Sequence, residues 1–297
     1  MKIKQAVRPA MLCAVLVACS STAEPSTDVS TTGIGSSVVP TTVVLTSAVP
    51  TSVDLNKKDL HGADLRDSNL QHADLSGADL SDADLSGSVM IFGVFSATNF
   101  SGANLSQVNL ADTILSGANF IGANLRGANL KGANLSNANL SGVDLSGANL
   151  TGTNLQGAIM IDTNLSNANL SDVSLKGANL KGANLSGASL YLVDLSDADL
   201  TGAALQNANL VRANLSDADF SYANLVGAYL IGADLTGAYF YEAKLEGANL
   251  TDANLARNDL NCAFLQGAIL KDVMNWTGNP NQCVDSSGGP ADNYADD

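Results

Sequence analysis

Residues 122–130 read Gly122-Ala123-Asn124-Leu125-Arg126-Gly127-Ala128-Asn129-Leu130, and this pattern decides the fold. Its unit of five residues repeats without a slip of register from Leu55 to Leu270. The positions divisible by five hold 37 Leu, five Phe and two Met. Ala usually stands two residues before each of them, Asn or Asp one residue before, and Gly, Asn or Asp two residues after. A tandem repeat this short determines the architecture before any local preference does.

The period of five excludes a regular helix or strand. Five residues advance an α-helix by about 500°, so successive Leu side chains would leave no apolar stripe. On a continuous strand, an odd period would send each Leu to the opposite face. The chain must therefore turn in every repeat, between three-residue strands that hold Ala and Leu inward and Asn or Asp outward. Gly, Asn or Asp at the second corner position predicts a type II turn, which requires a positive φ there.

The motifs Gly122-Ala123-Asn124-Leu125 and Gly247-Ala248-Asn249-Leu250, in unbroken tandem, resemble those of the pentapeptide repeat proteins. The resemblance implies an all-β fold, a right-handed quadrilateral β-helix (solenoid) with four repeats per coil. The 44 repeats would then form about 11 coils and, at about 4.8 Å per coil, a rod about 50 Å long. One group of large residues is separated by multiples of 20, which favours four sides: Phe100, Phe120, Met160, Phe220 and Phe240.

The N-terminal segments differ from the repeat in composition. In residues 1–18, Lys2, Lys4 and Arg8 precede a short apolar run, as in a signal peptide. The run ends at Leu16-Val17-Ala18-Cys19. This ending resembles a bacterial lipobox, which implies that Cys19 becomes a lipidated N-terminus anchored to a membrane of the cell envelope; an ordinary secretory signal is the alternative. Residues 19–52, rich in Ser, Thr, Val and Pro, predict a flexible stalk that reaches about 30 Å.

The chain is strongly acidic. Its net charge is −15, and it becomes −18 once the three basic residues of segment 1–18 are removed. Such a surface disfavours direct contact with nucleic acid and with anionic lipid headgroups. At 20 residues per coil, four pairs of carboxylates would stack: Asp59/Asp79, Asp64/Asp84, Asp197/Asp217 and Asp199/Asp219. Binding of Ca²⁺ or of a basic partner is one interpretation of these stacks, and a solvated face is the preferred one. Stacked Asn in mid-rod predicts amide ladders.

Two groups of apolar or aromatic residues interrupt the polar exterior. The first candidate interaction patch contains Val89, Ile91, Phe92, Val94 and Ile114. The second contains Tyr222, Tyr229, Tyr239 and Tyr241. Exposed apolar patches on a protein surface usually mark contacts, although chance on a repetitive surface and cover by the stalk are alternatives. A two-fold dimer of rods through the first patch is the simplest partner hypothesis.

The repeat domain is expected to span residues 53–272, followed by a cap and a disordered tail at 273–297. Val273, Met274 and Trp276 are expected to cover the last coil. With Cys13 removed and Cys19 acylated, Cys262 and Cys283 remain as a pair. An oxidising compartment then favours a Cys262–Cys283 disulfide that pins the cap, with Cys262 at an outward corner position.

The sequence predicts no catalytic site, cofactor or metal centre. It contains no Ser/His/Asp, CxxC, HExxH or phosphate-loop pattern, and its two His residues lie at outward positions. The preferred function is a membrane-tethered, extracytoplasmic structural or protein-interaction module that binds envelope proteins. The resemblance implies an alternative, because some acidic members of the family imitate duplex DNA and bind type II topoisomerases. The signal sequence argues against this alternative, since those enzymes are cytoplasmic.

Overall fold

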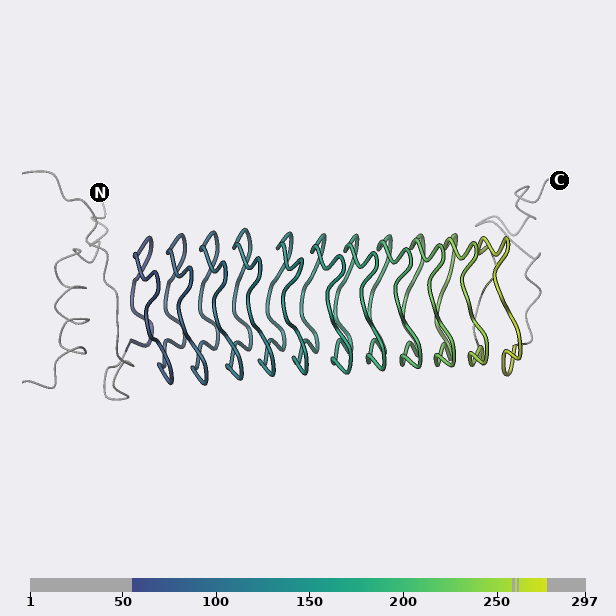
Figure 1. Ribbon diagram of the computed structural model, residues 1–297, viewed down its shortest axis with the longest axis horizontal. Helices are drawn as coiled ribbons and strands as arrows, with labels where there is room; N and C mark the ends of the chain where they lie inside the picture. Colours follow the sequence, from purple (N-terminus) through teal and green to yellow (C-terminus); the bar gives the residue numbers. More distant parts are fainter. Residues whose placement is uncertain (1–54, 258–259, 261, 277–297) are drawn as a thin grey trace, which may run out of the picture.

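The computed structural model describes residues 55–257, 260 and 262–276, which wind into a four-sided solenoid. Parallel β-bridges join outward residues 20 positions apart, from Asp59↔Asp79 to Asn254↔Met274. Each coil therefore holds four repeats. Figure 1 shows the coils stacked in one row from the purple N-terminal coil to the yellow C-terminal coil. Regular structure in the described part of the chain consists of single bridged residues between turns. Among these same residues, no helix is long and apolar enough to cross a membrane.

The outward bridge residues form four columns, one on each side of the coil. We name the faces by the first residue of each column: the Asp59, Asp64, Asn69 and Asp74 faces, in chain order. Two corner residues separate each face from the next. The corner between the Asn69 face and the Asp74 face, which holds Ile91 and Phe92, is called the Phe92 edge below.

Every corner has the backbone geometry that the sequence predicts. All second corner positions from Lys57 to Asp272 have φ between 52° and 72°, whether or not the residue is Gly. A hydrogen bond closes each typical turn, as from Ala133 N–H to the Leu130 carbonyl at 2.9 Å. Positive φ favours Gly and, to a smaller extent, Asn and Asp. The repeat therefore places these residues where the chain must bend.

The repeat 129–133 shows how one pentapeptide satisfies its backbone donors. Three N–H groups bond to the neighbouring coils, one closes the turn, and the last bonds to the outward Asn side chain. These bonds are Asn129 N–H to Val108 O (2.9 Å), Leu130 N–H to Asn149 O (2.9 Å), Gly132 N–H to Thr151 O (2.9 Å), Ala133 N–H to Leu130 O (2.9 Å) and Lys131 N–H to Asn129 Oδ1 (3.3 Å). The outward Asn or Asp is thus an acceptor that completes the corner.

The outward Asn side chains also form the expected ladders. Asn129 Nδ2 donates to Asn109 Oδ1 at 2.9 Å, and Asn149 Nδ2 donates to Asn129 Oδ1 at 3.2 Å. Donation runs toward the preceding coil, so a carboxylate fits at the N-terminal end of a ladder, where only an acceptor is needed. Asp79 takes this place for Asn99, at 3.0 Å.

The interior contains Leu and Ala in columns, with almost no exposed surface. The Phe residues at multiples of 20 share one column, as the spacing predicted: the rings of Phe100 and Phe120 stack at 5.0 Å. Phe95 lies in another column, and its ring explains an irregularity. Gly93 replaces the usual inward Ala because a methyl group there would approach Phe95 Cζ to 2.8 Å.

Two expectations for the C-terminal end of the rod are wrong, one about Met274 and one about Cys262. Val273 and Trp276 are partly buried against the core, as a cap requires, but Met274 is 49% exposed because it occupies the outward bridge position opposite Asn254. Cys262 was expected to face outward, yet it is 5% exposed. It is disulfide-bonded, and its backbone keeps the corner geometry, with φ of 64°. The expected partner Cys283 lies outside the described residues.

Candidate interaction surfaces

The structure brings the five residues of the first patch together around the Phe92 edge. Val89 lies on the Asn69 face, Ile91 and Phe92 form the corner, and Val94 and Ile114 follow on the Asp74 face. Val94 and Ile114 bridge adjacent coils. The side chains of Phe92 and Ile114 are 52% and 43% exposed. The patch is thus continuous and open to solvent.

His72 adds a member to this patch that the sequence analysis missed. Its ring stacks on Phe92, with centroids 5.3 Å apart and planes 16° apart. The signal was present in the sequence, because residues 20 apart occupy the same position in successive coils. The imidazole covers one side of the Phe92 ring and gives the patch a polar border.

Phe92 occupies an unfavourable backbone position. Its φ is 58°, at a corner site that favours Gly, and two other large exposed residues share this feature: Leu192 at 57° and Tyr222 at 62°. The left-handed conformation costs a residue with a Cβ about 1–2 kcal/mol. None of the three side chains is buried in return, since they are 52%, 43% and 55% exposed. The corner itself requires this φ, which Gln107 and Arg212 share; what distinguishes the three residues is the large apolar side chain left exposed, and that is a reason to infer a contact.

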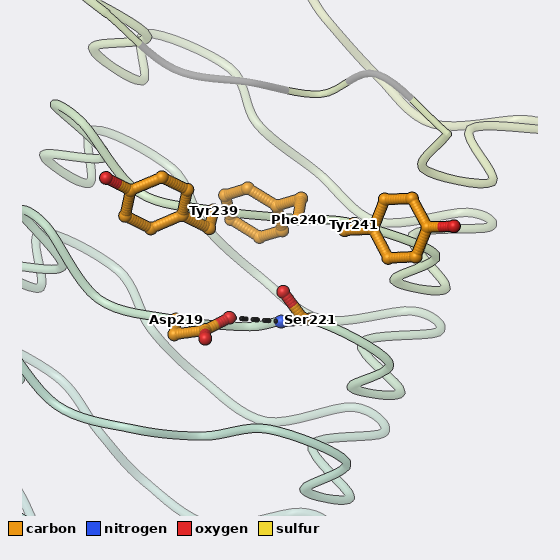
Figure 2. Close-up of a pocket in the computed structure, with 5 residues that line it drawn as sticks. All are labelled: Asp219, Ser221, Tyr239, Phe240 and Tyr241. Atoms are coloured by element: carbon orange, nitrogen blue, oxygen red, sulfur yellow. Dashed lines mark hydrogen bonds between the residues drawn. The ribbon is translucent and has the colours of Figure 1, made fainter. Parts of the chain in front are cut away.

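The second patch is divided by the structure. Tyr222 and Tyr241 meet edge to face, with ring centroids 5.5 Å apart. Tyr239 lies beside them on the Asp59 face. Figure 2 shows Tyr239 and Tyr241 on either side of a shallow hollow above Asp219 and Ser221. The hollow has a volume of about 220 Å³ and is also lined by Phe240.

Tyr229 does not belong to this group, which corrects the sequence prediction. It precedes Tyr239 by ten residues, or half a coil, and bridges Asn209 on the Asn69 face. The Asn69 and Asp59 faces are on opposite sides of the coil. Closeness in sequence misled the prediction, because two repeats turn the chain by half a revolution.

Tyr229 instead adjoins a cluster on the Phe92 edge that the sequence analysis did not single out. Tyr191, Leu192, Val211 and Ile231 occupy successive coils of this edge. Leu192 and Tyr229 are 43% and 50% exposed, and the other three side chains are half-buried. Counting in steps of 20 would have found the cluster, since 191, 211 and 231 are equivalent positions.

The stacked carboxylates are held by local donors and by a few cations. Arg66 bonds to Asp64 at 2.7 Å and approaches Asp84 to 3.9 Å. Lys176 pairs with Asp197 at 3.2 Å and Lys181 with Asp199 at 3.0 Å. Within the described part of the chain, no group of three or more His, Cys, Asp or Glu side chains could hold a metal ion.

The pentapeptide repeat family model matches the chain in eight copies, at residues 51–82, 59–91, 94–132, 128–167, 158–197, 168–206, 198–237 and 233–272. This chain is a pentapeptide repeat protein. The fold of this family is a right-handed quadrilateral β-helix, so the solenoid is right-handed. Pentapeptide repeat proteins are generally non-catalytic.

Several proteins of known structure are similar to this one. HetL, involved in heterocyst differentiation regulation in the cyanobacterium Nostoc sp. strain PCC 7120, is 34% identical over 80% of this chain and 93% of its own, with a TM-score of 0.31. A thylakoid lumen protein of Arabidopsis thaliana is 31% identical over 35% of this chain and 69% of its own, with a TM-score of 0.25. QnrB1, a plasmid-mediated fluoroquinolone resistance protein, is 21% identical over 68% of this chain and 90% of its own, with a TM-score of 0.29. The sequence matches no curated protein.

Three other predictions for this pentapeptide repeat protein fall outside the described residues. They are the lipidated Cys19 with its signal sequence, the stalk at 19–52, and the tail beyond the cap. They remain predictions from the sequence.

Proposed function

We propose that this pentapeptide repeat protein is a non-catalytic, membrane-tethered interaction module of the cell envelope. The observation that carries the proposal is the contrast on its surface. A regular exterior of Asn, Asp and Ser is interrupted by large apolar side chains, and three of these are held at strained positive φ. Binding free energy in protein interfaces concentrates in a few such anchors. The first patch has the larger set of apolar residues and is the proposed main contact. It is called the Phe92 patch below and contains Val89, Ile91, Phe92, Val94 and Ile114, with His72 at its border.

The tether is the lipid on Cys19, and the stalk at 19–52 gives the rod its reach. In this arrangement about 11 coils form a rod about 50 Å long, which the stalk holds up to about 30 Å from the membrane. A single lipid chain binds a membrane reversibly, so stable anchoring requires more than one acyl chain. Imitation of duplex DNA is less well supported, because the outward column of the Asn69 face carries no charge from Asn69 to Ile269.

The tether is tested by fractionation of cells that express the full chain. We expect the wild-type protein in the membrane fraction and in the detergent phase. Cys19→Ala should leave it uncleaved or soluble. Cys13→Ala is the matched control, because that thiol lies within the proposed signal peptide, and it should behave as the wild type. Detergent partitioning of Cys19→Ala equal to that of the wild type would overturn the lipid anchor.

The contact is tested by cross-linking and pull-down from envelope extracts. Phe92→Asp with Ile91→Ser should remove the main cross-linked partner and leave the fold intact, because the inward Met90 and Phe95 are untouched. Ile121→Asp is the control, since Ile121 is 48% exposed on a different corner. If the profile of the double variant equals that of the control, the patch has no binding role, and Tyr222, Tyr239 and Tyr241 become the next site to vary.

A further inference from the structure

One face of the rod differs from the others in charge. The Asn69 face contains no Asp, Glu, Lys or Arg among its described outward residues, which are Asn69, Val89, Asn109, Asn129, Asn149, Asn169, Ser189, Asn209, Tyr229, Asn249 and Ile269. The Asp59, Asp64 and Asp74 faces each carry several Asp residues in their columns. Two copies of a chain with net charge −15 repel each other least across the Asn69 face.

The edge beside this face carries two apolar clusters in the same register. Ile91 and Phe92 form the first, and Tyr191 and Leu192 begin the second, 100 residues later. At 20 residues per coil, the clusters are five coils apart, or about 24 Å at the spacing of paired strands. Phe92 and Leu192 also share the strained corner geometry, with φ of 58° and 57°.

We propose that a second copy of this chain binds antiparallel, with the two Asn69 faces in contact and Phe92 of each copy against Leu192 of the other. A two-fold axis perpendicular to the rods and in the plane of contact keeps both Phe92 edges on the same side. When this axis passes midway between the two clusters, the Ile91 and Phe92 cluster of each copy lies against the Tyr191 and Leu192 cluster of the other. Such an interface is self-complementary, as a two-fold dimer requires.

A parallel dimer would not use these residues. Rotation about an axis along the rods brings the Phe92 edge against the corner on the other side of the Asn69 face. That corner has Ser86, Ser106 and Arg126 in the coils level with and following Phe92. It offers no apolar surface opposite Phe92, so the antiparallel arrangement buries more apolar area.

Charges along the Phe92 edge limit the strength of the antiparallel pair. Between and beside the two clusters the edge carries Asp112, Lys131, Asp172 and Arg212, two of each sign. In the proposed register the Lys131 level lies opposite Thr151. Lys131 is then one coil from Asp172 of the other copy, and also one coil from its own Asp112. In this register Asp112 lies level with Asp172 of the other copy, so the two carboxylates face each other, and Lys131 one coil away offsets only part of their repulsion.

The contact is narrow, and this sets the conditions of the test. From His72 to Arg212 the edge spans seven coil steps, or about 34 Å, with few large side chains. Interfaces that bury less than about 1,200 Å² in total are typical of weak complexes. Dimers should therefore be sought at protein concentrations up to about 500 µM.

The inference rests on the proposed interaction role and not on the membrane tether. Sedimentation of the purified full chain with Cys19→Ala tests it without a membrane or other proteins. We expect reversible dimers. Phe92→Asp and Leu192→Lys should each weaken dimerisation at least about tenfold, because both remove an apolar anchor. Together they should restore dimers in low salt, because every contact then pairs Asp with Lys, and added salt should abolish the recovery.

Each outcome decides a part of the proposal. Ile121→Asp is the matched control and should dimerise as the parent does. A parent that stays monomeric at about 500 µM overturns the dimer. Dimers that survive both single variants exclude this surface, and a double variant that does not recover excludes the pairing of Phe92 with Leu192. Phe92→Gly, which suits the positive φ, is the second variant if Phe92→Asp unfolds the chain. It should weaken dimers by the same factor.

Discussion

Over the same two coils, the Asp59 face and the Asp74 face use the outward position of the repeat differently. On the Asp59 face, Asn99 donates to Asp79 at 3.0 Å and Asn119 donates to Asn99 at 3.1 Å. On the Asp74 face, Val94 and Ile114 have no side-chain donor or acceptor. The backbone bridges are nevertheless the same on both faces. The side-chain ladder therefore stabilises a coil that the core and backbone already define.

This difference separates two roles of one sequence position. Asn and Asp at the outward position complete the corner and link the coils. Val94 and Ile114 give up those bonds and leave apolar surface exposed, 43% in the case of Ile114. A residue that costs stability and gains no burial is the kind expected where a partner binds. This difference between the faces can be tested first in the core that they share and then at their outward positions.

The largest effect is expected in the core beneath both faces. Leu130 is fully buried, and Leu130→Asp removes its packing and buries an unpaired charge. Loss of the side chain alone costs about 2–5 kcal/mol, and the charge adds to this. We expect lost β-structure in circular dichroism and a lower melting temperature. Asn129→Asp, one residue away, is the control: it keeps the acceptor for the corner N–H and loses only the donation to Asn109, so the circular dichroism should be unchanged and the melting temperature should fall far less. An unchanged melting temperature in Leu130→Asp would mean that the inward assignment is wrong.

Most of the fold could be predicted from the sequence because the period is short and strict. The inward columns of Ala and Leu, the positive φ at corners and the shared column of Phe100 and Phe120 all follow from counting residues. The role of the outward Asn as an acceptor for the corner N–H did not follow. That bond depends on the side-chain rotamer, which a repeat pattern does not specify.

The candidate site was predicted in part. Residues of the Phe92 patch are close in sequence as well as in space, except for Ile114 and His72, which are displaced by one coil. Tyr229 was assigned to the wrong face because sequence distance replaced position in the coil. The cluster at Leu192 was missed for the same reason. Cys262 keeps the corner φ but is buried, and its disulfide is a constraint outside the repeat.

A moderate effect should separate the two uses of the outward position. Asn129→Ala removes the acceptor of Lys131 N–H and two ladder bonds, and it should lower the free energy of unfolding by about 1–2 kcal/mol. Ile114→Asn should do the opposite and raise it by about 0.5–1 kcal/mol, because it supplies an acceptor for the corner N–H and for Asn134, although Val94 offers no acceptor to its Nδ2. The urea midpoint measures both. Equal midpoints for Asn129→Ala and the wild type would show that the ladder does not stabilise the rod.

The smallest effect concerns pH and the outward carboxylates that accept bonds from corner Ser residues. Ser81 Oγ donates to Asp79 at 2.6 Å, and this bond, offset in part by burial, lowers the pKa of Asp79. The bond from Ser76 likewise lowers the pKa of Asp74. A carboxyl group whose pKa is lower in the folded state stabilises the fold above the pKa of the unfolded chain, about 4. The contribution is lost as pH falls through the folded value.

Ser81→Ala should therefore destabilise the rod more at pH 7 than at pH 3. The difference should stay below about 1 kcal/mol, because Asp79 is only half-buried and solvent screens the interaction. Ser141→Ala is the matched control: Ser141 Oγ donates to Asn139 Oδ1 at 2.8 Å, and an amide does not titrate in this range. Its cost should be the same at both pH values. Urea midpoints of the two variants across this range give the comparison. If both variants lose the same stability at every pH, the charge on Asp79 contributes nothing, and the outward carboxylate is equivalent to Asn as a structural acceptor.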